Sequence, residues 1–120
     1  MCGLNIYEIT MTKRKELSKN KNKRKSIIYI QARLHAAETY ASIIMKYIIT
    51  ELTSNYQQYD KIFENHIVKL VPMINPDGVV IGNSRCSIAG LDLNRRWAEP
   101  NPFVHPEIYF LKHHLKLVSK

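Results

Sequence analysis

The stretch SIIYIQARLHAAETYASIIMKYIITELTS, residues 26–54, decides the fold of this chain. Residues 26–32 are nearly continuous in apolar character, which predicts a strand buried on both faces. Residues 38–53 carry apolar side chains at helical spacing, which predicts an amphipathic helix. The apolar stripe of that helix comprises Ala41, Ile44, Met45, Ile48 and Leu52. A strand that leads into such a helix is typical of an α/β fold.

Further strands are expected on both sides of this unit. Residues 4–10, LNIYEIT, and residues 67–73, IVKLVPM, are rich in apolar and β-branched side chains and predict two more strands. We expect the first two strands to form a hairpin, and the second and third to be joined by a helical crossover. Pairing should weaken at Pro72, which cannot donate to a ladder. The prediction is an α/β domain with a partial mixed sheet and packed helices.

The second half of the chain predicts a long irregular stretch and one helix. The sequence NPDG at residues 75–78 is dense in turn-forming residues and predicts a turn. Residues 79–102 are expected to be irregular. A last helix should open at HPE, residues 105–107, because proline suits the first helical position and glutamate the positive end of the helix dipole. Its buried face is expected to comprise Ile108, Leu111, Leu115 and Val118.

Composition indicates one small domain without a membrane association. The 120 residues hold 18 Lys and Arg against 10 Asp and Glu, a net charge of +8. No stretch approaches the roughly 18 apolar residues that span a bilayer, and no apolar secretory signal is visible near the start. Two cysteines, Cys2 and Cys86, make no disulfide framework, which favours a reducing, cytosolic setting.

Most of the excess charge lies in one segment. Residues 13–25, KRKELSKNKNKRK, hold eight Lys or Arg and one Glu, a net of +7 out of the total of +8. A run of like charges repels itself, which favours a solvated loop between two strands. The alternative is an electrostatic handle for an acidic partner. Nucleic-acid binding is not expected, because no aromatic side chain interrupts the run to stack on bases.

His35 and Glu38 form the first candidate for chemistry. They lie where the strand at residues 26–32 gives way to the helix, which is a common position for a site in an α/β fold. A His and a Glu three residues apart can converge on one point, and both are zinc ligands. Alone, the spacing is weak evidence for a metal site and favours the alternative, a loop histidine beside a glutamate that complements the helix dipole.

The irregular segment at residues 75–95 supplies the second set of candidates. It concentrates Arg85, Asp92, Asn94 and Arg95 in one loop. Two arginines and an amide near a metal would suit a substrate that carries a carboxylate. The alternatives are solvated surface arginines and, for Asp92, a turn residue that bonds its own backbone.

Taken together, these motifs resemble the amino-terminal part of the catalytic domain of an M14 zinc carboxypeptidase. The resemblance is to the cytosolic carboxypeptidase subfamily and, within it, to the tubulin-processing branch. The matching pieces are ITMTK at 9–13, ARLHAAETYAS at 32–42, LTS at 52–54, VPMINPDGVVIGNSRCSIAGLDLNRRW at 71–97 and HPEIYFLK at 105–112.

The resemblance implies a single zinc ion. His35 and Glu38 match the first two zinc ligands, although this chain has Ala36-Ala37 where the family usually has Pro-Gly. Asp92 matches the carboxylate that orients the zinc-bound histidine. The family's third ligand, a histidine, and its general base, a glutamate, lie in segments with no match here. The chain, residues 1–120, is therefore expected to be an incomplete catalytic domain that is inactive alone.

The resemblance also implies a substrate class. Asn94 and Arg95 match the pair that holds the terminal carboxylate, and Arg85 matches the arginine that polarises the scissile carbonyl. The implied function is zinc-dependent removal of carboxy-terminal residues in the cytoplasm, typically glutamate from tubulin-like or polyglutamylated acidic tails. The alternative is an inactive truncated paralogue, or a fragment, that binds acidic peptide tails without catalysis.

Overall fold

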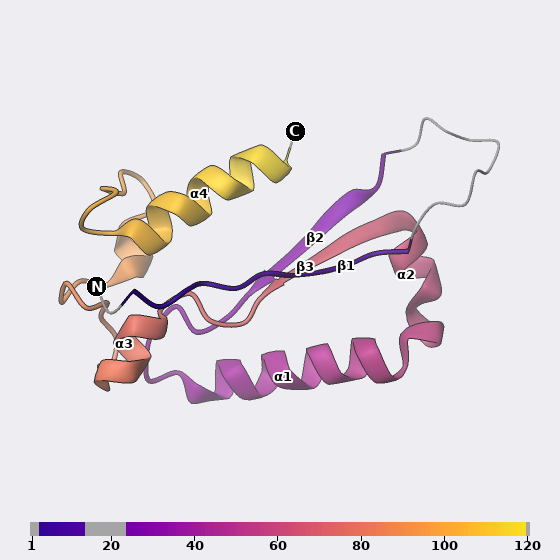
Figure 1. Ribbon diagram of the computed structural model, residues 1–120, viewed down its shortest axis with the longest axis horizontal. Coiled ribbons are helices and arrows are strands. Elements are labelled where there is room, and N and C mark those ends of the chain that lie inside the picture. Colours follow the sequence, from indigo (N-terminus) through magenta and orange to yellow (C-terminus); the bar gives the residue numbers. More distant parts are fainter. Residues whose placement is uncertain (1–2, 14–23, 120) are drawn as a thin grey trace.

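The computed structural model describes residues 3–13 and 24–119 (Figure 1). The strands are β1 (Ile9–Met11), β2 (Ser26–Gln31) and β3 (His66–Val71). The helices are α1 (Thr39–Ser54), α2 (Asp60–Asn65), α3 (Pro76–Ile81) and α4 (Pro106–Val118), with short 3₁₀ turns η1 (Tyr56–Tyr59) and η2 (Leu93–Arg95). The predicted α/β class is confirmed.

The sheet has the order β1-β3-β2, so the predicted hairpin between the first two strands is wrong. β3 lies between them, antiparallel to β1 and parallel to β2. Its Leu70 is opposite both Ile9 of β1 and Ile30 of β2. β3 is the most buried of the three strands because in the central place both of its edges are paired and both of its faces are covered. The predicted crossover from β2 through α1 to β3 is confirmed.

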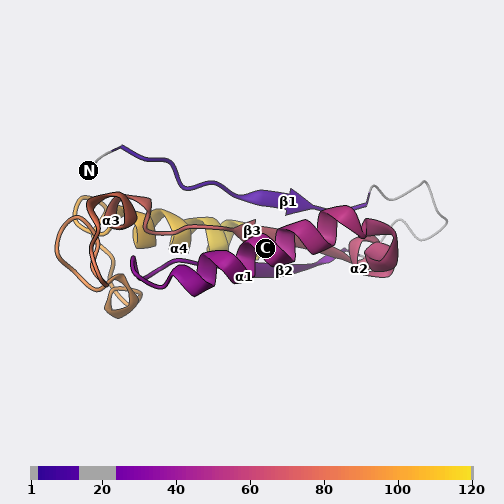
Figure 2. The same cartoon turned by 90° about the horizontal axis from the view of Figure 1, so that it is seen from below.

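Helices cover both faces of the sheet, and the alternation of side chains along β3 decides which core each one joins. Val68 and Leu70 pack with Met45 of α1 in one apolar cluster. The next residue, Val71, joins Ile108 of α4 in a second cluster. Figure 2 accordingly shows α1 in front of the sheet and α4 behind it. The result is a three-layer α/β/α arrangement.

Several predicted boundaries need correction. β1 begins at Ile9 and not at Leu4, because the residues before it make no ladder bonds. β2 is half-buried where full burial was predicted: Ile28 and Ile30 pack on one core cluster and Tyr29 on the other, but each stays partly exposed. α1 begins and ends within one residue of the prediction, but Ile44 is 56% exposed and Ile49 packs on the core in its place.

The NPDG sequence starts a helix, where the prediction was a simple turn. The side chain of Asn75 accepts a hydrogen bond from the backbone N–H of Gly78, and Pro76 occupies the first turn of α3. Asparagine at the cap and proline just inside are the favoured residues for a helix start. α3 ends at Gly82, whose φ of 84° is left-handed. The last helix, α4, opens at Pro106 as predicted.

A polar cluster ties α4 to the sheet. The carboxylate of Glu8 accepts a hydrogen bond from Lys69 Nζ of β3, and its second oxygen lies 2.7 Å from His114 Nε2 of α4. Burial alone would raise the pKa of Glu8, but the bonds from Lys69 and His114 outweigh burial and lower it. Nearby, burial raises the pKa of Tyr29 to about 12. The cluster therefore holds an ionised carboxylate under α4.

Most of the basic segment at 13–25 lies outside the described residues, as does Cys2. At its start, Lys13 Nζ makes an ion pair of 2.7 Å with Asp60 of α2. Over the described ranges, no helix combines the length and the apolar character that crossing a membrane requires.

Candidate metal centre

The candidate residues gather at the carboxyl ends of the parallel strands β2 and β3. The loop at 32–38 follows β2 and the loop at 72–95 follows β3, so both emerge at the same edge of the sheet. Backbone bonds join the two loops, from Ala37 N to Ser84 O at 2.8 Å and from Asn75 N to Arg33 O at 3.2 Å. Chain segments separated by about 50 residues in sequence are thereby placed side by side.

His35 lies at the centre of this site and uses both ring nitrogens. Its Nδ1 is 2.9 Å from Glu38 Oε1, and its Nε2 is 3.1 Å from Asp92 Oδ1. The histidine is only 8% exposed. The two carboxylates therefore hold opposite edges of one buried imidazole ring and fix its orientation.

Asp92 is a strongly ionised acceptor. The guanidinium of Arg85 donates from Nε to Asp92 Oδ2 at 2.7 Å and holds the pKa of Asp92 down at about 2. Burial opposes the effect of Arg85 on this pKa, and the backbone N–H of Asn94 and the ring of His35 lower the pKa further. An ionised carboxylate only accepts hydrogen bonds, so the Nε2 of His35 carries the proton.

With the Nε2 proton on the side of Asp92, the Nδ1 atom of His35 faces a carboxylate oxygen of Glu38. Two acceptors 2.9 Å apart repel each other unless a proton or a cation lies between them. Both atoms are zinc ligands with bonds of about 2.0–2.2 Å, so one zinc ion could contact both. The donor set of His35 and Glu38 therefore fits zinc.

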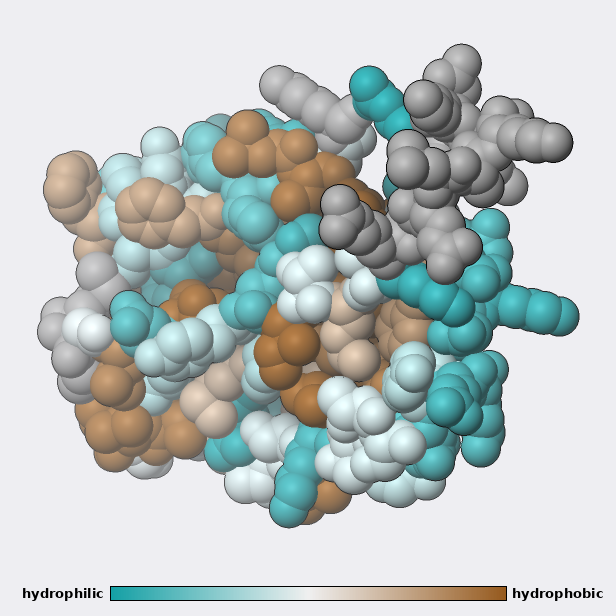
Figure 3. Space-filling view, turned by 45° about the vertical axis from the view of Figure 1, so that its right-hand side comes forward, coloured by the Kyte–Doolittle hydropathy of each residue, from teal (hydrophilic) through white to brown (hydrophobic). Residues whose placement is uncertain are grey.

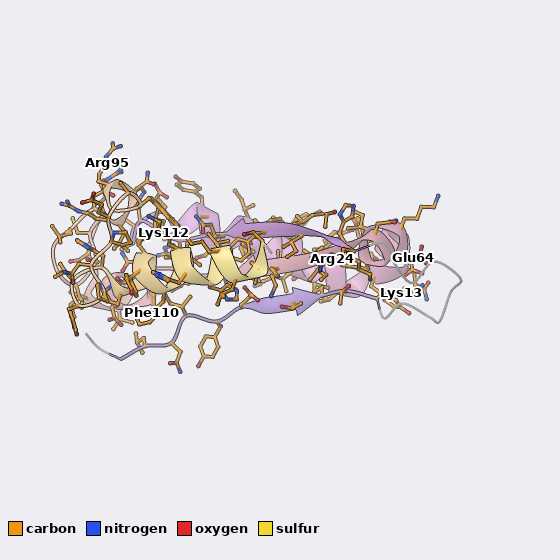
Figure 4. All side chains as sticks on the ribbon, turned by 90° about the horizontal axis from the view of Figure 1, so that it is seen from above. Lys13, Arg24, Glu64, Arg95, Phe110 and Lys112 are labelled. Carbon is orange, nitrogen blue, oxygen red and sulfur yellow. The ribbon has the colours of Figure 1, made fainter. Side chains whose placement is uncertain are left out.

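The two arginines reach Asp92 from the exposed side of the site, and Asn94 contributes its backbone N–H to Asp92 Oδ1 at 2.9 Å. Arg85 is half-exposed, and Arg95 is 72% exposed with its Nε 3.9 Å from Asp92 Oδ2. Figure 4 shows Arg95 projecting outward at the end of the molecule opposite Lys13. The structure thus brings together all six residues predicted from the sequence, with the two arginines toward solvent. The six are His35, Glu38, Arg85, Asp92, Asn94 and Arg95.

Two residues that shape the site were not predicted as site residues from the sequence. Arg33 has a left-handed φ of 56°, which is rare for a residue other than glycine and marks local strain. Its side chain donates to Ala36 O at 2.7 Å and to Ser42 Oγ at 2.9 Å, which curls the loop under His35. Asn75 is fully buried beside the same loop. No sequence pattern marks Arg33 as a residue with a left-handed φ. Asn75 is the first residue of the NPDG motif, which also predicts an ordinary turn.

The other histidines lie elsewhere. Over residues 3–13 and 24–119, no three His, Cys, Asp or Glu side chains are grouped as a metal site. His66 pairs with Ser26 of β2, and His114 pairs with Glu8. His105 is buried at the start of α4, and His113 contacts the carbonyl of Tyr109. The described residues thus offer two converging zinc ligands.

The structure thus has a strand-helix-strand core with a histidine and a glutamate at the carboxyl edge of the sheet, an arrangement that suits a metal-dependent enzyme of the α/β class. The family model for zinc carboxypeptidases matches residues 2–109. This chain belongs to the zinc carboxypeptidase family.

Similar proteins include the cytosolic carboxypeptidases. Mouse (Mus musculus) cytosolic carboxypeptidase 1 is 51% identical over 85 residues, which cover 71% of this chain and 7% of that protein. Mouse cytosolic carboxypeptidase 6 is 42% identical over 88 residues, which cover 73% of this chain and 16% of that protein. The chain therefore spans less than a fifth of the length of these curated relatives.

Solved structures show the same fold. A metallo-carboxypeptidase from Pseudomonas aeruginosa aligns with a TM-score of 0.76 at 29% identity, over 92% of this chain and 28% of that one. One from Burkholderia cenocepacia aligns with a TM-score of 0.82 at 24% identity, over 92% and 30%. The chain corresponds to less than a third of either enzyme.

Proposed function

We propose that this protein acts in the zinc-dependent removal of carboxy-terminal residues from peptides. One observation carries the proposal: Asp92 lies 3.1 Å from His35 Nε2, and the Nδ1 of the same ring faces Glu38 Oε1 at 2.9 Å, so that a nitrogen and an oxygen suited to a shared zinc ion lie side by side. Membership of the zinc carboxypeptidase family supports the same reading.

His35 and Glu38 would hold the metal. When bound, zinc supplies Lewis acidity and lowers the pKa of a coordinated water. Asp92 keeps the His35 ring in the tautomer whose Nδ1 is free to bind. Because Asp92 engages the Nε of the Arg85 guanidinium, the remaining N–H groups of Arg85 stay available on the open side of the site.

The arginines would recognise the substrate. Arg85 would donate to the scissile carbonyl oxygen and stabilise the negative charge that develops on it. Arg95 and Asn94 would hold the free carboxylate at the end of the peptide, since a guanidinium and an amide match its two oxygens. The high exposure of Arg95 leaves its guanidinium accessible to such a carboxylate.

The substrate class that we propose is acidic peptide tails that end in glutamate, including tubulin-like and polyglutamylated tails, in the cytoplasm. Support comes from the two accessible arginines and from the similarity to proteins named cytosolic carboxypeptidases. A basic segment of net +7 elsewhere in the chain favours acidic partners in general.

We further propose that the chain, residues 1–120, supplies the amino-terminal part of a catalytic domain, with the third ligand and the general base in a segment beyond it. The radius of gyration is 16.5 Å, against about 14 Å for a compact domain of this length. Tyr40, Ile43 and Tyr47 of α1 are 60–71% exposed, and apolar groups reach the face shown in Figure 3. Both features suit a piece of a larger folded unit.

A second function follows from the site as described: binding of acidic tails without hydrolysis. Two converging ligands fall short of the three that a catalytic zinc requires. In that case Arg85 and Arg95 would still bind a terminal carboxylate, but no bond would be broken.

The experiment compares two chains: residues 1–120 alone, and a chain in which they continue into the rest of a zinc carboxypeptidase domain with its histidine and glutamate. Glutamate release from a glutamate-ended peptide is measured with and without a chelator. We expect the longer chain to release glutamate and residues 1–120 to release none. The chelator or His35→Ala should abolish the release, and Arg95→Ala should weaken the capture of the substrate. Lys116→Ala, at an exposed site on α4, is the control.

The outcomes separate the two functions. Chelator-sensitive turnover by residues 1–120 would show that the site is complete in this chain and would refute the incomplete-domain proposal. Peptide binding that depends on Arg95, with no release from either chain, would establish the binding function in place of catalysis.

A further inference from the structure

The side chain of Asn75 is fully buried, and both its oxygen and its NH₂ group have hydrogen-bond partners. Its Oδ1 accepts from Gly78 N at 2.9 Å, and its Nδ2 donates to Leu34 O at 3.3 Å and to Cys86 O at 3.1 Å. A primary amide offers one such acceptor and two N–H donors, and each has a partner here. The amide is therefore held in one orientation.

The three partners belong to three different segments. Leu34 directly precedes His35, Cys86 directly follows Arg85, and Gly78 lies in the first turn of α3. The backbone N–H of Asn75 adds a bond to Arg33 O at 3.2 Å. One amide group thus joins the loop that carries His35 to the loop that carries Arg85 and Asp92.

Close packing around Gly78 shows that this junction has no free space. A Cβ atom at residue 78 would lie 2.5 Å from Asn75 Oδ1 and 2.6 Å from the backbone oxygen of Cys86. Real Cβ atoms do not approach other atoms so closely. The carbonyl of Cys86 can therefore lie against the start of α3 only because residue 78 is glycine. Asn83 Nδ2 supports the same loop by donating to Ser87 O at 3.0 Å.

We propose that Asn75 is a positioning residue for the metal centre, which sets the distance between His35 and the Asp92–Arg85 pair. The inference rests on the proposed function, because it assigns a role in that same site. Asn75 touches neither a ligand atom nor a substrate-binding group in the hydrogen bonds described, so it acts through Leu34 and Cys86.

An ordinary helix cap is the competing explanation, and the two roles use different atoms. The cap requires Oδ1, whereas the junction requires the two N–H groups of Nδ2. Asn75→Ser keeps a capping oxygen and removes both donors, and serine caps helices about as well as asparagine. Asn75→Asp also keeps the cap and nearly keeps the shape, but places an acceptor against the two carbonyls.

The test uses residues 1–120 with both variants and the control Asn65→Ser, which removes an exposed amide that donates to Lys61 O at 2.7 Å. The first measurement is the long-range proton–nitrogen NMR spectrum of the histidine rings without metal, where the bond to Asp92 gives His35 Nε2 its own signal. The second is the zinc dissociation constant by competition with a chromophoric chelator. Far-UV circular dichroism checks the fold.

We expect both Asn75 variants to move the His35 signal toward that of a free imidazole. They should also weaken zinc binding by about tenfold, the lower end of the range of affinity losses seen when a group that orients a metal ligand is removed. The control should change neither. An unmoved His35 signal in a folded Asn75 variant would overturn the proposal, as would failure of both variants to fold, since that would assign Asn75 to global stability. If the unmodified chain binds no zinc, the proposed function is decided on the longer chain described above, while the His35 signal of residues 1–120 still tests Asn75.

Discussion

Asp92→Asn should weaken zinc binding strongly, although it changes the shape of the side chain very little. Asp92 accepts from Arg85 Nε at 2.7 Å, from His35 Nε2 at 3.1 Å and from Asn94 N at 2.9 Å. An amide has one oxygen to offer on one side and an NH₂ group on the other. It cannot accept from Arg85 and from His35 at the same time.

Both orientations of the amide damage the site. If its oxygen faces His35, its NH₂ group meets the donor of Arg85 at a distance of 2.7 Å. If it is flipped, its NH₂ group meets His35 Nε2 and drives the ring proton to Nδ1, the atom that we assign to the metal. Loss of a group that orients a ligand typically weakens metal binding by 10–100-fold, and the upper half of that range is expected here because two charge-assisted bonds are lost.

The assay is competition with a chromophoric chelator at neutral pH, on residues 1–120 whose folding has been checked by circular dichroism. Asp60→Asn is the matched control, because Asp60 also accepts a short bond from a cation, Lys13 Nζ at 2.7 Å, at the opposite end of the molecule (Figure 4). The control should bind zinc as the unmodified chain does. An affinity of Asp92→Asn within twofold of that chain would refute the assigned tautomer and the role of Asp92.

Three further predictions concern the fold. Leu70→Ala should destabilise the protein by about 3 kcal/mol in urea unfolding, because Leu70 is fully buried in the central strand; a loss below about 1 kcal/mol would contradict this. Gly78→Ala should destabilise by about 1–3 kcal/mol through overpacking, and an unchanged midpoint would show that the junction can expand. Lys69 and His114 lower the pKa of Glu8, so the contribution of Glu8 to the free energy of unfolding is present above its ordinary pKa of 4.5 and is lost as the pH falls through the lowered pKa. Glu8→Gln should remove this part of the acid dependence of stability. The same pH dependence of stability in both proteins would count against the cluster.

Local sequence patterns predicted the elements well where one period dominates. α1 and β3 were located within about two residues, because each buries a regular apolar row against the same cluster around Met45 and Leu70. The pairing of strands was predicted wrongly. Whether Ile9 pairs with β2 or β3 depends on contacts across 60 residues, and neither strand's own pattern encodes that choice.

The site shows the same division. His35 and Glu38 are three residues apart at a helix start, so their convergence follows from local geometry. Asp92 lies 57 residues from His35, and its placement was expected through the family resemblance alone. The role of Asn75 could not be predicted, because a turn and a junction between loops have the same NPDG sequence and differ only in what packs against them.

The strand order has a consequence for how the protein is made. The central strand β3 is the last of the three to leave the ribosome, about 40 residues after β2. At 5–20 residues per second, β2 waits roughly 2–8 s and β1 roughly 3–12 s for the neighbour that they share. α1, complete at Ser54, emerges within that interval and is available to shield Ile28 and Ile30 of β2 first. A pause after residue 54 and before residue 66 has emerged would therefore prolong the exposure of the unpaired edges of β1 and β2, whereas a pause once residue 71 has emerged would not.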